Sequence, residues 1–281
     1  MDKFDFLNTL TYLGAAFILF LIGKFSYKLI HRSTDVNHVL LEDDNVAFAA
    51  SMVGYYAAII CTIGGALIGP QADILSDLID IFSYGLLAIV LLHISAFINE
   101  KLLFTKFNIR KEIITDRNLG TGVIEGANYL ATGLIVYGAI IGEGGGYLTA
   151  IAFWALAQVL FWLASRLYQL ITPYDIHAEI EKDNVAVGIG LAGALIAIAL
   201  LIKTGIQADF ESWTGSLLTV AIDTTAGFIF LPVARFLTDK ILLPTRNLTD
   251  EIVNQEHPNV GAALIEAFAY IGGAVLIGWA L

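Results

Sequence analysis

Charged residues are scarce in this sequence, and that scarcity separates it from soluble proteins. They make up 15% of its 281 residues, whereas hydrophobic residues make up 57%. A soluble domain of this size cannot bury that much apolar surface, so the composition predicts a lipid bilayer as its surroundings. Cysteine is nearly absent as well, since Cys61 is the only one. An intrachain disulfide is therefore excluded, and Cys61 is expected to act as a small buried hydrophobe.

Basic residues are also few, and several catalytic motifs are missing. The chain has 15 Lys and Arg against 26 Asp and Glu, a formal charge of −11, and no basic patch interleaved with aromatic residues. This composition argues against nucleic-acid binding. The sequence contains no G-x-x-x-x-G-K-[ST], no G-x-S-x-G and no H-E-x-x-H, and its histidines lack metal-site spacing. We therefore expect no enzyme activity, no metal and no cofactor.

Long hydrophobic runs are what the sequence has in abundance. A helix needs roughly 20 apolar residues to cross about 30 Å of hydrocarbon. The runs are solidly apolar and rich in Ala, Leu and Ile, whereas a barrel strand would alternate, so each run is predicted to be a helix. The sequence thus predicts an all-α transmembrane fold with helices at approximately 6–24, 45–69, 77–99, 119–142, 147–171, 184–206, 213–236 and 259–280.

The distribution of basic residues predicts the orientation of these helices. If the N-terminus lies outside the cytoplasm, every Lys and Arg except Lys3 and Lys203 falls in a cytoplasmic loop or at a cytoplasmic helix end. Basic residues near membrane helices are retained on the cytoplasmic side. Both termini are therefore expected to be extracytoplasmic.

The sequence is an internal duplication. Residues 1–142 and 147–281 are predicted to be two four-helix membrane repeats joined by the short linker "EGGG". Because each repeat crosses the membrane an even number of times, both insert in the same orientation, and a pseudo-twofold axis along the membrane normal is expected, with equivalent positions facing each other. Three matches carry the duplication: "EDDNVAFAASMVG" (42–54) with "EKDNVAVGIGLAG" (181–193), "EKLLFTKFNIRKEII" (100–114) with "DKILLPTRNLTDEIV" (239–253), and "NLGTGVIEGANY" (118–129) with "NVGAALIEAFAY" (259–270).

The two copies of these motifs resemble a known family. A paired "DNVA" that leads into a glycine- and alanine-rich helix, together with a paired N-x-G-x-x-x-I-E-x-x-x-Y, is similar to the DUF350 proteins of bacteria. The resemblance covers nearly the whole chain as two tandem units. It implies a bacterial inner-membrane location and a four-helix unit, but no activity. Together with the orientation expected from the basic residues, an inner-membrane location places both termini in the periplasm.

A carboxylic acid lies inside one helix of each repeat. Glu125 is seven residues after Asn118 and four before Tyr129, which places all three on one helix face and Glu125 about 10 Å deeper than Asn118. Burying an ionised carboxylate in the membrane is costly, so such a residue indicates a function by default. The residues expected to form a cation- or proton-binding site are Glu125, Glu266, Tyr129, Tyr270, Asn118 and Asn259.

Two interpretations of these glutamates stay open at this point. In one, Glu125 and Glu266 bind a cation or relay a proton inside a polar path. In the other, each is a protonated acid that hydrogen-bonds across helices and holds the bundle together. The small-residue stripes nearby, such as Gly122 and Gly126, indicate close helix packing in either case.

A second polar group is expected at the cytoplasmic helix ends. Asp44–Asn45 and Asp183–Asn184 stand where two helices begin. An aspartate there can cap the free N–H groups of the first turn. The alternative is that these residues form an acidic mouth for a cation path.

The residues therefore favour a small ion channel or an ion- or proton-coupled transporter. Its partners would be the lipid bilayer and a monovalent cation or proton. The alternative is a non-transporting membrane scaffold or stress-response subunit that binds a partner through its cytoplasmic loops. The sequence leaves open a homodimer or another oligomer.

Overall fold

The computed structural model describes residues 3–69, 73–103, 108–242, 244 and 246–280. Eight helices within these ranges are long and apolar enough to cross a membrane, and no strand occurs among the described residues. The predicted all-α transmembrane fold is confirmed. The long helices are α1 (Lys3–Ile30), α2 (Val46–Leu67), α3 (Ile74–Leu103), α4 (Leu119–Ile141), α5 (Gly146–Ile171), α7 (Val185–Ile206), α8 (Trp213–Leu237) and α10 (Val260–Ala280).

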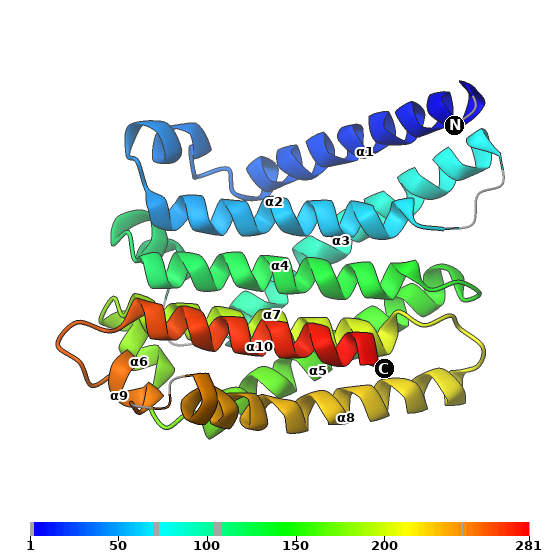
Figure 1. Cartoon of the computed structure of the whole chain (residues 1–281). Coiled ribbons are helices and arrows are strands. Elements are labelled where there is room, and N and C mark those ends of the chain that lie inside the picture. Colours follow the sequence, from blue (N-terminus) through cyan, green and yellow to red (C-terminus); the bar gives the residue numbers. More distant parts are fainter. Residues whose placement is uncertain (1–2, 70–72, 104–107, 243, 245, 281) are drawn as a thin grey trace.

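Short helical turns lie between the long helices. They all gather at one end of the bundle, and α1 begins and α10 ends at the opposite end (Figure 1). Both ends of the chain therefore lie on the same side, as an even number of crossings requires. The short elements are η1 (His38–Glu42), η2 (Lys111–Thr115), α6 (Ile176–Glu181), η3 (Thr238–Leu242) and α9 (Leu248–Ile252).

Four of the long helices form a central row. The most extensive packing is between α2 and α4, and α7 packs against both α4 and α10 (Figure 1). The other long helices lie beside this row: α3 packs on α2 and α4, and α5 packs on α4 and α7. At the two ends of the row, α10 is far less enclosed than α4 and α7, and α2 is moderately less enclosed.

The repeats are arranged along this row and not face to face. Helix α7 is the second repeat's equivalent of α2, and α10 is the equivalent of α4. The repeats meet through α4 and α7, which are not equivalent helices. The expectation that equivalent positions face each other across one interface is therefore wrong for the described helices. A twofold axis would require α10 to pack on α2, but α4 lies between these two helices (Figure 1), and α10 packs on α7 instead.

Small residues bring α2 and α4 into backbone contact. A side chain at Gly54 would collide with the backbone of Gly126, and one at Gly122 would collide with the carbonyl of Ala47. Helices can approach this closely only where no side chain separates them. The packing role expected of the small-residue stripes is confirmed. The short separation also brings polar side chains of α2 within reach of Glu125 on α4.

Candidate functional site

Asparagines, not aspartates, begin the central helices. The Oδ1 atoms of Asn45, Asn118 and Asn184 each accept a hydrogen bond from the backbone N–H three residues later. Asp44 and Asp183, expected as caps, instead adopt left-handed φ angles of 48° and 60°. The prediction that an aspartate caps these helices is wrong. A short Asp side chain tolerates the left-handed turn that aims the following Asn at the helix.

The same asparagines tie each helix start to one of the short helical elements. The Nδ2 of Asn45 donates to the carbonyl of Ile113 at 2.8 Å, and that of Asn184 donates to Ile252 at 3.0 Å. Asn118 links the two repeats, because its Nδ2 donates to the carbonyl of Ile180 at 2.8 Å. The polar atoms of Asn118 are thus used in capping at the helix end, and it does not join Glu125 in a common site. Asn259 caps α10 in the same way.

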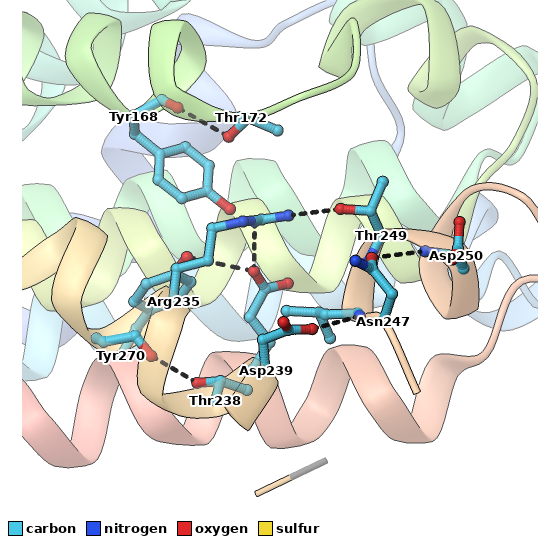
Figure 2. Close-up of polar contacts among 12 residues, drawn as sticks. Tyr168, Thr172, Arg235, Thr238, Asp239, Asn247, Thr249, Asp250 and Tyr270 are labelled. Atoms are coloured by element: carbon cyan, nitrogen blue, oxygen red, sulfur yellow. Dashed lines mark hydrogen bonds and ion pairs between the residues drawn. The ribbon is translucent and has the colours of Figure 1, made fainter. Parts of the chain in front are cut away.

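Glu266, in the second repeat, is enclosed by protein and paired with an arginine. Its side chain has 0% exposure, and the Nη1 of Arg235 on α8 lies 2.6 Å from its Oε1. The hydroxyl of Tyr270 donates to the same oxygen at 3.2 Å. Figure 2 shows Arg235 reaching toward Thr249 of α9, whose hydroxyl it contacts at 3.4 Å. The guanidinium balances the charge of the buried carboxylate and fixes its position.

Glu266 itself is enclosed, although Arg235 also lines a pocket of about 280 Å³, of which Glu266 is not a lining residue. The guanidinium stands 5.8 Å from the ring of Tyr174, whose own pKa burial raises to about 12. The other carboxylate oxygen, Oε2, lies beside Gly190, where a Cβ would come within 2.7 Å of it. Oε2 has no hydrogen-bond partner in the described part of the chain. The second repeat therefore holds an internal ion pair.

Glu125, in the first repeat, has a different environment. The hydroxyl of Ser51 on α2 donates to its Oε2 at 2.5 Å. The described residues place no basic side chain against it. Instead it borders a cavity of about 70 Å³, lined by Ile30, His31, His93, Ala96, Phe97, Glu100, Ile109, Glu125, Asn128 and Tyr129. A single water needs about 10–15 Å³ of such space, so the cavity has room for several waters or for a small cationic group.

Two carboxyl groups border this cavity, and no Lys or Arg is among its lining residues. Glu125 and Glu100 supply these carboxyl groups, and Glu100 is exposed at the end of the bundle where the short helices gather. His31 supplies no compensating charge at neutral pH, because burial lowers its pKa below the ordinary histidine value. The Nε2 of His93 faces the Ser26 hydroxyl at 2.7 Å and the Tyr55 hydroxyl at 3.3 Å. A cation entering this space would be the missing counterion.

The two repeats thus surround their aligned glutamates with different residues. The position of Arg235 in the second repeat is held by Ala96 in the first, and Ala96 lines the cavity. The position of Ser51 is held by Gly190 in the second repeat. The first repeat therefore has a hydroxyl and an empty volume where the second has a glycine and a guanidinium. Of the two glutamates, Glu125 lines a cavity and Glu266 is fully enclosed in the described part of the chain.

The predicted site residues do not form one common site; in each repeat the glutamate lies with the tyrosine of the same repeat. Tyr129 lines the cavity with Glu125, and Tyr270 bonds to Glu266. The two glutamates take their hydrogen-bond partners from their own repeats, and α7 lies between their helices. Sequence analysis missed the roles of Ser51 and Arg235. The signal was present, because these are positions where the aligned repeats exchange a polar residue for a small one.

Other candidates from the sequence lie apart from the cavity. Asp44 and Asp183 are exposed in the turns before α2 and α7, and neither lines the cavity. Among the described residues no group of three or more His, Cys, Asp or Glu side chains could hold a metal ion. The chemistry available at Glu125 is thus proton exchange or the binding of a cation through a carboxylate, a hydroxyl and aromatic rings.

The fold and this geometry define a multi-pass membrane protein built from two tandem four-helix repeats. The chain belongs to the DUF350 family, described as a domain of unknown function, which matches residues 3–140 and again 144–281. It is 19% identical over 254 residues to a UPF0719 transmembrane protein of Aquifex aeolicus (strain VF5), covering 88% of this chain and 90% of that protein. No solved structure is significantly similar to it.

Proposed function

We propose that this protein is an ion- or proton-coupled membrane transport protein whose cation site is the Glu125 cavity of the first repeat. One observation carries the proposal. The equivalent volume in the second repeat is filled by the Arg235 guanidinium, whereas in the first repeat it is open and bordered by two carboxyl groups. Intramembrane acids without a fixed counterion are costly to keep unless they bind one.

The second repeat suggests the kind of cation. Its glutamate is satisfied by a planar guanidinium, with a tyrosine hydroxyl on the same carboxylate oxygen. A monovalent cation with a guanidinium or ammonium group would make the same contacts with Glu125 and lie among the rings of His31, Phe97 and Tyr129. Na⁺, K⁺ and a proton are the smaller alternatives for the same carboxylate.

The cavity would exchange with the cytoplasm under the orientation expected from the basic residues. We propose a bacterial inner-membrane location with both termini in the periplasm. Glu100 then stands at the cytoplasmic entrance, and Glu125 lies about 10 Å deeper than the start of α4. Glu266 is assigned a structural role, which replaces the expectation of two equivalent functional acids.

The test is gradient-driven uptake into proteoliposomes. The cations are guanidinium, methylammonium, Na⁺, K⁺ and H⁺, each tested alone. Glu125→Gln removes the carboxylate, and Ala96→Arg supplies the internal counterion that the second repeat already has. We expect both changes to reduce uptake of the transported cation at least about tenfold, or about 1.4 kcal/mol.

The control variant is Glu143→Gln, which removes an acid in the linker between the repeats, far from the cavity. It should transport like the wild type. Thermal unfolding in detergent should show Ala96→Arg to be at least as stable as the wild type, because the new arginine pairs with Glu125. Uptake that is equal in all four proteins, or absent from all of them for every cation, would reject the proposal and favour the scaffold alternative.

A further inference from the structure

The helix contact that joins the two repeats has equivalent surfaces on the helices at the two ends of the row, and in one chain these two surfaces do not meet. Within the chain, Gly120 of α4 meets Gly188 of α7, where a Cβ on Gly188 would lie 2.7 Å from the Gly120 Cα. Near the other end of the same helices, a Cβ on Gly138 would lie 3.0 Å from the Lys203 side chain. The equivalent positions are Gly261 and Trp279 on α10, and Ala49 and Gly64 on α2. Among the described residues, α10 and α2 of one chain do not pack against each other in this way.

The exposed faces of α2 and α10 match the buried faces of their equivalents. Val53 and Ile60 on α2 are 68% and 62% exposed, whereas the residues at these positions on α7, Ala192 and Ala199, are buried. On α10, Phe268 and Leu276 are 66% and 63% exposed, and the equivalent positions Ala127 and Ile135 on α4 are buried. The same surface is thus an interface inside the chain and open at its two ends.

A further exposed apolar residue, Leu41 in η1, lies outside the membrane spans. Ile180, four residues before the Asn184 cap, is 1% exposed and accepts the Asn118 bond that joins the repeats. Leu41, four residues before the Asn45 cap, is 81% exposed. The donor that would correspond to Asn118 is Asn259, which is exposed at the start of α10. Contact with lipid chains does not account for an exposed leucine in this loop.

The second repeat also has an open groove at the place where α5 packs on the first repeat. In the first repeat, α5 lies against α3 and α4, and the indole N–H of Trp154 donates to the Ser95 hydroxyl at 2.7 Å. The equivalent place in the second repeat, between α8 and α10, is an apolar groove of about 600 Å³ that includes Phe230, Ala234 and Trp279. Helix α1 is the first repeat's equivalent of α5, and it is the least enclosed of the candidate spans.

We infer that copies of this chain assemble head to tail in the membrane, with α8 and α10 of one copy against α1 and α2 of the next. This contact would be equivalent to the one inside the chain, where α3 and α4 of the first repeat pack on α5 and α7 of the second. Because the two surfaces are different, the assembly is heterologous and closes as a ring or extends as a row. Side-chain volume fits this arrangement, since Trp279 would stand opposite Gly64 where Gly138 stands opposite Lys203.

Disulfide crosslinking in native membranes tests the arrangement, in a Cys61→Ala background. Two differently tagged chains are co-expressed, one with Gly64→Cys and the other with Trp279→Cys. We expect oxidation to join a Gly64→Cys chain to a Trp279→Cys chain, and to give no more than background homodimers of either. A chain carrying both substitutions should give covalent multimers or a covalently closed ring.

Two controls make the result decisive. The pair Gly138→Cys and Lys203→Cys should form an intrachain disulfide, which shows that this helix separation permits the bond. Val90→Cys, at an exposed position on α3, replaces Gly64→Cys in the negative control and should not crosslink to Trp279→Cys. Equal crosslinking at Val90 and Gly64, strong homodimers of either single variant, or a single-chain mass in lipid nanodiscs would each overturn the inference. None of these outcomes depends on transport through the Glu125 cavity.

Discussion

At the residue scale, the informative fact is that two aligned glutamates have different partners. Glu266 has an arginine and a tyrosine, and Glu125 has a serine and a cavity. A buried ion pair is weak evidence for stability as a pair, but breaking one partner leaves an uncompensated charge. The pair of Arg235 and Glu266 should therefore be costly to break and cheap to replace as a whole.

Replacing Arg235 alone tests this difference. Arg235→Met should lower the free energy of unfolding by about 3–5 kcal/mol, because Glu266 is then buried without a counterion. The double variant Arg235→Met with Glu266→Gln should recover most of that loss. The measurement is thermal or denaturant unfolding in detergent. Equal destabilisation in the single and the double variant would show that packing of the arginine, and not its charge, is what matters.

The position of Glu125 could be predicted from the sequence, but the identity of its neighbours could not. Spacing along one helix placed Glu125 and Tyr129 on a common face, and the structure has both lining the cavity. Ser51 and Ala96 come from two other helices, and their distance from Glu125 depends on how α2 and α3 pack on α4. A single helix face carries no information about that packing, so only the comparison of repeats could have indicated these residues.

At the element scale, small residues and asparagine caps set the spacing of the central row. The eight spans were predictable because membrane helices must be about 20 apolar residues long. Their order in the row was not, because lipid-facing and protein-facing apolar residues differ little in a membrane. Glycine and alanine stripes indicated close contact, but they did not say that α4 would pack on α7 and not on α10.

The contact between α2 and α4 gives a sharp prediction at this scale. Gly54→Ala should destabilise the protein by about 1–3 kcal/mol, because the new methyl group collides with the backbone at Gly126, which cannot rotate away. Gly14→Ala in α1 is the matched control, since nothing lies within 4 Å of a Cβ there. It should be neutral or stabilising by about 0.5–1 kcal/mol. Unfolding in detergent compares the two, and a neutral Gly54→Ala would mean that the helices are further apart.

At the scale of the whole molecule, duplication made the repeats alike in fold and different in chemistry. The first repeat keeps a polar cluster in which the Asn99 amide donates to Asn128 and Thr132 at 3.0 and 3.2 Å. The equivalent positions in the second repeat are Thr238, Ala269 and Gly273. The first repeat thus holds the polar cluster and the cavity at its glutamate, while the second holds the buried ion pair and a larger apolar groove. This division matches a transport site in the first repeat, and the groove of the second repeat would receive the first repeat of the next copy.

The orientation of the molecule yields the last prediction. The short helices and nearly all of the basic residues of the described chain lie at one end of the bundle, and that end should face the cytoplasm (Figure 1). Lys3 and Lys203 are the basic residues of the other half, and the Lys203 ammonium lies 4.9 Å from the centre of the Tyr137 ring, so its charge is partly compensated. Alkaline phosphatase fused after the C-terminus, or inserted at Gly145, should be active because it is exported. Green fluorescent protein at either site should stay dark, and it should fluoresce when inserted in the loop after α9, at Gln255. Fluorescence at the C-terminus would invert the topology and place the Glu125 cavity on the periplasmic side.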